Sequence, residues 1–102
     1  MSNETAKDLE KELDELEENR LTVEFLNNQI VETVYTKIGD TLTHCLIIVK
    51  NGFSFTGESS CVDPNNYNKD IGEKIAYDNA FDKMWPVYGF VLRQHLAAKN
   101  KL

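Results

Sequence analysis

The stretch LTHCLIIVKNGFSFTGESS, residues 42–60, decides the fold. Its two halves are rich in β-branched and aromatic residues, which favour β-strands. Asn51 and Gly52 between them both tolerate a positive φ angle, so the pair predicts a two-residue type I′ hairpin turn. Such a turn places Phe55 opposite Ile48. The stretch therefore predicts two antiparallel strands.

Further elements follow on either side of this hairpin. Residues 30–38 are rich in Val, Ile, Thr and Tyr and predict a preceding strand, with a turn at Gly39-Asp40. The unbroken apolar run Leu46–Val49 is typical of a strand covered on both faces. Two C-terminal helices are predicted over residues 69–84 and 87–98, with a break at the intervening Trp-Pro pair.

The helices complete an α+β arrangement. Residues 4–27 contain no Gly or Pro and are rich in Glu, Lys and Leu, which predicts one long N-terminal helix. Gly72, Ala76 and Ala80 lie four residues apart, a stripe of small side chains that favours close packing on the sheet; a seam with another subunit is the alternative. We therefore expect a long N-terminal helix, a three-stranded antiparallel sheet with an Asn-Gly hairpin, and two C-terminal helices packed on the sheet.

The chain is expected to be a single domain over residues 1–102, and its charge is unevenly distributed. It divides into an acidic helix (1–28), antiparallel strands (29–60) and a loop and helical part (61–102). The first part carries the whole net charge of −6, and the last twenty residues contain four bases and no acid. The acidic head is either a solvated helix face or a partner for the basic tail of the same or another subunit. This distribution disfavours binding to duplex nucleic acid, which needs a broad basic surface.

Composition and motifs narrow the functional classes. No apolar run approaches the roughly 18 residues of a membrane span, and the polar N-terminus lacks the core of a secretory signal. Two cysteines, Cys45 and Cys61, make neither a disulfide framework nor a zinc set, so we expect a reduced cytoplasmic protein. No Cys-x-x-Cys, His-Glu-x-x-His, Walker or Gly-x-Gly-x-x-Gly motif occurs. The sequence therefore predicts no enzyme, no cofactor and no metal site.

What the sequence does contain is a set of side chains suited to binding. Phe55 and Tyr67 are among the rings that can stack on a flat heterocycle, and the asparagines at 65–68 suit base edges or ribose hydroxyls. Lys83 and Arg93 suit phosphates. Each feature has a plainer explanation, namely a core position, a turn or a solubilising surface charge.

An ordered series of short motifs adds a resemblance. These are Asn51-Gly52-Phe53, Gly57-Glu58-Ser59-Ser60-Cys61-Val62-Asp63-Pro64-Asn65-Asn66-Tyr67, Ile71-Gly72-Glu73-Lys74-Ile75-Ala76-Tyr77-Asp78-Asn79-Ala80, Trp85-Pro86 and Tyr88-Gly89-Phe90-Val91-Leu92-Arg93. The series resembles a family of small tailed-phage proteins that includes the Thoeris anti-defence sponge proteins. It covers residues 40–95 and leaves the acidic helix outside.

The resemblance implies a non-catalytic function in the host bacterial cytoplasm. Such sponges sequester a cyclic ADP-ribose-type signal made by bacterial immune TIR enzymes, and some hold cyclic oligonucleotides at a second site. They are small α+β subunits that assemble as dimers or as hexamers, a trimer of dimers. The candidate ligand-binding residues are Phe55, Asn65, Asn66 and Tyr67 as one wall of a pocket, with Lys83 and Arg93 on the phosphate side, from the same or the facing subunit.

One alternative function stays open at this point. The acidic N-terminal helix also suits a phage protein–protein interaction module or an inhibitor of a host factor. Stacking aromatics and core aromatics look alike in a sequence, so the residues alone do not separate the two functions.

Overall fold

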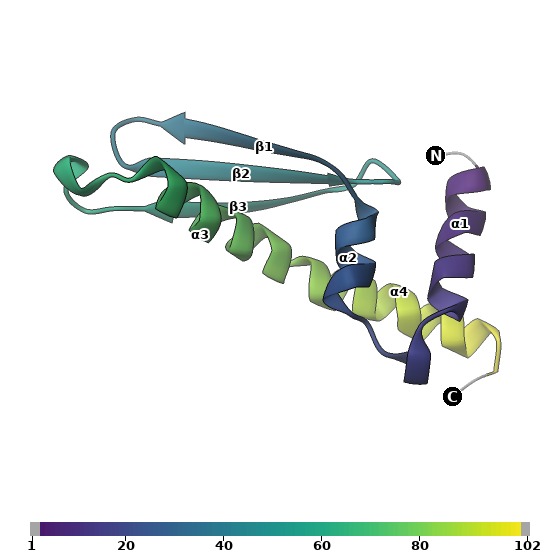
Figure 1. Cartoon of the computed structure of the whole chain (residues 1–102). Helices are drawn as coiled ribbons and strands as arrows, with labels where there is room; N and C mark the ends of the chain where they lie inside the picture. Colours follow the sequence, from purple (N-terminus) through teal and green to yellow (C-terminus); the bar gives the residue numbers. More distant parts are fainter. Residues whose placement is uncertain (1–2, 101–102) are drawn as a thin grey trace.

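The computed structural model describes residues 3–100 and has the α+β architecture that the sequence predicts (Figure 1). Its elements are α1 (Asn3–Asp14), η1 (Glu17–Asn19), α2 (Val23–Gln29), β1 (Ile30–Ile38), β2 (Leu42–Val49), β3 (Ser54–Ser60), η2 (Pro64–Asn66), α3 (Lys69–Asp82) and α4 (Met84–Ala98). The antiparallel strands form one sheet in the order β1-β2-β3. α3 lies along one face and α4 continues past its end, so the molecule is elongated, with extents of 55 × 27 × 17 Å (Figure 1).

The N-terminal segment forms two helices instead of one. Between them, Glu18 and Asn19 have φ angles of 54° and 52°, a left-handed backbone that does not continue an α-helix. α2 starts anew at a cap, where Thr22 Oγ1 accepts a hydrogen bond from Phe25 N at 3.0 Å. The prediction of one long helix over residues 4–27 is therefore wrong. The leucine seam of α1 also does not stay in phase with the buried residues of α2.

Thr22→Ala is expected to lower the free energy of unfolding by about 1 kcal/mol, because it removes the hydroxyl that caps the first turn of α2. Thr22→Ser keeps the hydroxyl and is the matched control. Urea denaturation followed by circular dichroism measures both variants. An equal loss in the two would mean that the methyl group matters and the cap does not.

The turn between β2 and β3 differs from the predicted type I′ turn. Gly52 N donates to Val49 O at 2.8 Å and Val49 N donates to Phe53 O at 3.0 Å, so the loop has three residues. Gly52 has a φ angle of 89°, whereas Asn51 is not among the residues with positive φ, which fits a type I turn followed by a left-handed glycine. Asn51 contributes its side chain instead, because its Oδ1 accepts a hydrogen bond from Phe53 N at 2.9 Å.

The longer loop shifts the register of the hairpin by one residue. Phe55 pairs with Ile47 and not with Ile48, and Gly57 pairs with Cys45. Because side chains alternate across a strand, a slip of one residue moves each of them to the other face. The predicted register is therefore wrong, and the observed one puts Phe55 on the buried face with Ile47.

The two faces of the sheet differ in how far helices cover them. Along β2 every second side chain is buried beneath the helices, and the alternating ones are half-buried. Within residues 3–100 no helix lies over this second face (Figure 1). The expected cover on both faces is therefore not provided by a single chain. We call this surface the open sheet face; its apolar members are Val34, Ile38, Leu42, Leu46 and Ile48.

On the covered face, α3 approaches the sheet backbone against backbone. A Cβ atom added to Gly57 would lie closer than 3.0 Å to backbone atoms of Ala76 and Ala80. Gly72 is similarly close to the sheet, and its carbonyl accepts a hydrogen bond from Ser59 Oγ at 2.6 Å. The stripe of small residues on α3 thus packs on the sheet, as predicted.

α3 and α4 meet at Lys83, whose own backbone is helical (φ −72°, ψ −17°). Pro86 lies in the first turn of α4, where its missing N–H would have no helical partner. The break therefore falls before Met84 and not at the Trp-Pro pair. The rings of Tyr88 on α4 and Phe55 on β3 are 6.3 Å apart, so α4 packs on the end of the sheet.

Candidate functional site

A hollow of about 110 Å³ lies where η2 and the start of α3 meet the ends of β2 and β3. Hydroxyl and amide side chains, together with the apolar side chains of Ile71 and Ile75, surround one aromatic ring there, and we call it the Tyr67 hollow. Its polar lining residues are Thr41, Thr43, Ser59, Ser60, Asn66 and Asn68. These groups both donate and accept hydrogen bonds, as base edges and ribose hydroxyls require.

Two side-chain caps fix the loop that forms one wall of this hollow. Asp63 Oδ1 accepts a hydrogen bond from Asn65 N at 2.9 Å and starts η2. Asn68 Oδ1 accepts a hydrogen bond from Ile71 N at 3.1 Å and starts α3. Tyr67 lies between the two capped turns and has an extended backbone. The caps on both sides therefore determine the direction in which its ring points.

The Tyr67 ring is held against the sheet and carries a cation. Its hydroxyl lies 3.3 Å from Thr43 Oγ1 on β2. The Lys37 ammonium, from β1, lies 4.3 Å from the ring centroid, a cation–π contact. An aromatic ring, a cation and several hydroxyls thus occupy one end of the molecule, which suits a flat heterocycle that carries phosphate.

The six residues predicted for ligand binding are brought together only in part. Asn66 and Tyr67 line the hollow, and Asn65 belongs to the same 3-10 turn. Phe55 is only 5% exposed and belongs to the core, which is the plainer of its two explanations. Its ring centroid lies 6.3 Å from that of Tyr88, so α4 covers it.

The two predicted phosphate-binding cations lie elsewhere. Lys83 is exposed at the junction of α3 and α4, and Arg93 borders a different hollow of about 360 Å³ on α4. At 1.5 Å per helical residue, Arg93 lies roughly 35 Å along the helices from Tyr67. Within one chain these cations and the Tyr67 hollow therefore form no common pocket.

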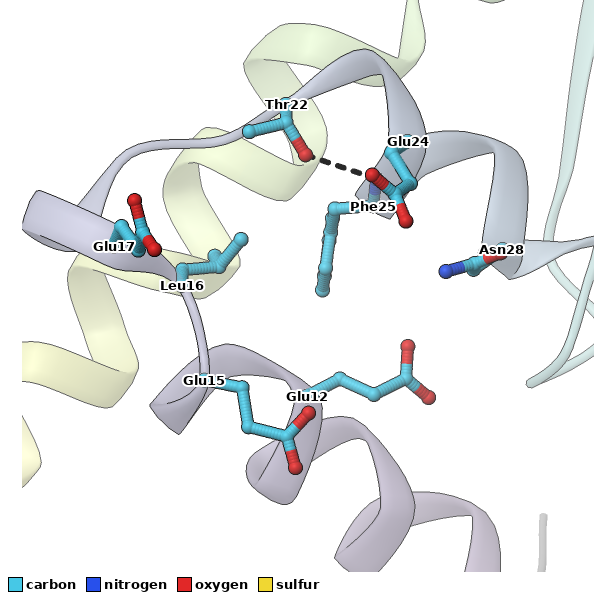
Figure 2. Close-up of a pocket in the computed structure, with 8 residues that line it drawn as sticks. All are labelled: Glu12, Glu15, Leu16, Glu17, Thr22, Glu24, Phe25 and Asn28. Carbon is cyan, nitrogen blue, oxygen red and sulfur yellow. Dashed lines mark hydrogen bonds between the residues drawn. The ribbon is translucent and has the colours of Figure 1, made fainter.

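A larger cleft, of about 420 Å³, lies between α1 and α2 and has an acidic character. Figure 2 shows four carboxylates around it, those of Glu12, Glu15, Glu17 and Glu24. Such a concentration of negative charge repels an anionic ligand. The smaller Tyr67 hollow is therefore the better candidate for a nucleotide.

Sequence reasoning missed the strand residues Thr43 and Ser59, which line the hollow, and Lys37, whose ammonium lies over the Tyr67 ring. The turn at Gly39-Asp40 carried a usable signal, because it pairs Lys37 with Thr43 across β1 and β2. Nothing local indicated that the loop after β3 returns to lay Tyr67 over that pair, since this is a tertiary contact.

Comparison with known proteins identifies the family. The family model described as phage protein (N4 Gp49/phage Sf6 gene 66) matches residues 21–96, about three quarters of the chain. The chain belongs to this phage protein family. No curated protein and no solved structure matches it.

The segment that matches this phage family corresponds to a defined set of structural elements. It contains α2, the sheet, the Tyr67 hollow, α3 and nearly all of α4, and it leaves α1 outside. In the described part of the chain, no helix has the length and apolar character needed to cross a bilayer. Among the same residues, no three His, Cys, Asp or Glu side chains are grouped so as to hold a metal ion.

Proposed function

We propose that this phage protein binds a cyclic nucleotide immune signal, of the cyclic ADP-ribose type, and sequesters it in the host cytoplasm without cleaving it. The Tyr67 hollow is the observation that carries the proposal. It presents an aromatic ring for a heterocycle and hydroxyls and amides for a ribose, and the Lys37 ammonium, which lies over the Tyr67 ring outside the lining, is the cation for a phosphate. Membership of a phage protein family and the motif series quoted above support it.

The size of the hollow indicates how much of such a ligand it takes. Pockets that enclose a whole small molecule measure about 300–1,000 Å³, whereas this one measures about 110 Å³. A ring or a ribose fits, and the rest of the ligand must lie across the rim. Lys83 and Arg93 remain candidates for its phosphates through a neighbouring copy of the chain.

Calorimetric titration of the protein with cyclic ADP-ribose isomers and cyclic oligonucleotides tests this proposal. Tyr67→Ala is expected to weaken binding about 10- to 100-fold, the usual loss for one base–aromatic stack. Tyr35→Ala, on the sheet but outside the lining of the hollow, is the matched control. Equal affinities of the two variants would exclude Tyr67, and binding by none of these ligands would exclude the function. Mass spectrometry of the released ligand must find it intact, because a converted ligand would indicate an enzyme.

A protein-interaction module is the second candidate, and the position of α1 favours it. α1 lies outside the matched family segment and exposes several acidic side chains, among them Asp8 and Glu10. If this function holds, Asp8→Lys combined with Glu10→Lys abolishes the activity in infected cells while calorimetry finds no nucleotide binding. Retained activity in that double variant would exclude it.

We further propose that the protein functions as a homo-oligomer built on the open sheet face. The face measures roughly 14 by 25 Å from strand spacing and length, so pairing two copies covers roughly 350 Å² on each, about 700 Å² in total. Stable protein interfaces bury roughly 1,200–2,000 Å², so residues beside the face must also contribute to the pairing. The apolar centre and polar border of this face have the usual anatomy of an interface.

A further inference from the structure

The way α1 is attached differs from the way the rest of the chain is held together. α1 is joined to the matched family segment by residues 15–22, which include the left-handed Glu18 and Asn19. The acidic cleft of about 420 Å³ separates α1 from α2 on one side. A second hollow of about 370 Å³ separates it from α4 on the other. α1 therefore sits between two gaps, and apolar contact holds it at few points.

The main apolar contact of α1 is Leu13, which is 2% exposed, with Leu9 and Leu16 packed at its sides. A helix of 12 residues is marginal in water when it stands alone. Because the apolar seam is short and the helix is marginally stable alone, polar contacts contribute much of the attachment of α1 to the rest of the chain.

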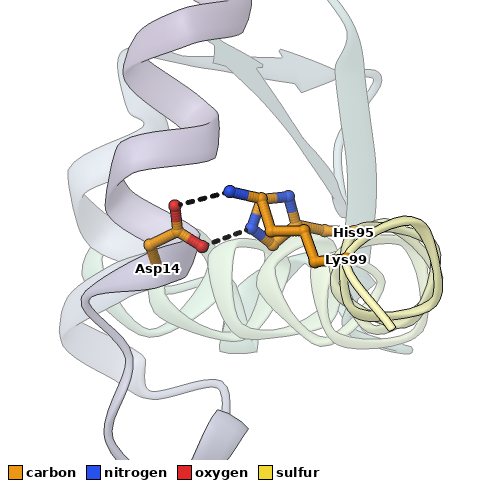
Figure 3. A network of polar contacts seen from close by, with 3 residues as sticks. All are labelled: Asp14, His95 and Lys99. Atoms are coloured by element: carbon orange, nitrogen blue, oxygen red, sulfur yellow. Dashed lines mark hydrogen bonds and ion pairs between the residues drawn. The ribbon is translucent and has the colours of Figure 1, made fainter. Parts of the chain in front are cut away.

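Two carboxylates of α1 make polar contacts with three other parts of the chain. Asp14 lies 2.7 Å from His95 Nε2 and accepts a hydrogen bond from Lys99 Nζ at 3.1 Å, both at the end of α4 (Figure 3). Glu12 accepts hydrogen bonds from Gln29 Nε2 at 2.5 Å and from Lys50 Nζ at 2.9 Å. The acidic head thus pairs with the basic tail of the same chain.

The ionised form of Asp14 is part of this contact. The hydrogen bonds from His95 and Lys99 lower the pKa of the Asp14 carboxyl below its ordinary value. The negative charge is therefore favoured when α1 is docked. Both carboxylates sit near the surface, where salt screens such attractions.

We propose that α1 is a detachable strap, latched to α4 by Asp14 with His95 and Lys99, and that it opens as a unit while the family segment stays folded. Opening uncovers the α4 surface around Val91 and His95, which α1 now faces. The strap gives the fold a salt-sensitive conformational switch at the end of the molecule opposite the start of α3 (Figure 1), which borders the Tyr67 hollow.

Hydrogen exchange of the full-length protein, read by mass spectrometry, tests the strap. The amides of residues 5–14 are expected to exchange faster than those of β2, because local opening exposes them without global unfolding. Asp14→Asn is expected to speed this exchange about three- to tenfold and to leave β2 unchanged. Asp8→Asn, the same substitution on the exposed side of α1, is the matched control and should have no effect.

The salt dependence of the exchange rate of α1 is a second, independent test of the strap. Raising the ionic strength from about 0.01 M to about 1 M shortens the Debye length from about 30 Å to about 3 Å. Exchange of the strap should accelerate in the parent protein and less in Asp14→Asn, which keeps the Glu12–Lys50 ion pair. Exchange of α1 at the rate of β2 in every condition would overturn the proposal, and so would equal behaviour of the Asp14 and Asp8 variants.

Discussion

Replacing Gly57 with alanine is expected to lower the free energy of unfolding by about 3 kcal/mol, at the upper end of the usual range for overpacking. The added Cβ atom would lie closer than 3.0 Å to backbone atoms of both Ala76 and Ala80. Neither the central part of α3 nor β3 can move a main-chain atom aside as a flexible side chain would. α3 must lift away from the sheet, and the buried contacts around Cys45 loosen with it.

Thermal unfolding measures this effect directly. A loss of about 3 kcal/mol lowers the Tm of a domain of this size by roughly 15 °C. Gly89→Ala is the matched control, because a Cβ atom there meets nothing within 4 Å and Gly89 lies within helix α4. Alanine at that position is expected to stabilise by about 0.5–1 kcal/mol through helix propensity. A similar small change in both variants would mean that α3 does not contact β3 as closely as described.

The elements that local chemistry determines were predictable from the sequence. The α+β order, the three strands and the small-residue packing face of α3 are confirmed. Two local predictions failed because, in each case, a side-chain hydrogen bond favours a different local structure. The Asn51 side chain caps its own turn, which lengthens the loop and shifts the register, and the Thr22 cap starts a new helix inside the predicted long one.

The candidate site was predictable only where the chain is continuous. Asn66 and Tyr67 follow one another in a loop with recognisable caps, and both line the hollow. Lys37 and Thr43 come from other strands, and only the tertiary return of the loop brings Tyr67 to them. Arg93 was grouped with Tyr67 by residue type, but the nearly continuous α3 and α4 place the two far apart in one chain.

Leu46→Glu is expected to convert the proposed oligomer into a monomer, with a loss of self-affinity of 100-fold or more. Leu46 is on the central strand, between Val34 and Thr56, so it lies near the middle of the open sheet face. Two copies packed face to face about a two-fold axis bring the introduced carboxylates close together. Like charges in a desolvated interface cost several kcal/mol, and this free energy corresponds to a loss of self-affinity of about 100-fold or more.

Sedimentation equilibrium measures the outcome against the chain mass of 11.7 kDa. Val62→Glu is the matched control, because Val62 is fully exposed in the loop after β3 and outside the open sheet face. The parent protein and this control should have twice the chain mass, or six times if three dimers associate, whereas Leu46→Glu should have the single-chain mass. A monomeric parent protein at high concentration would contradict the proposed assembly. Multimeric Leu46→Glu protein would show instead that the copies meet through another surface, and β1, as an edge strand, would then be the next surface to substitute.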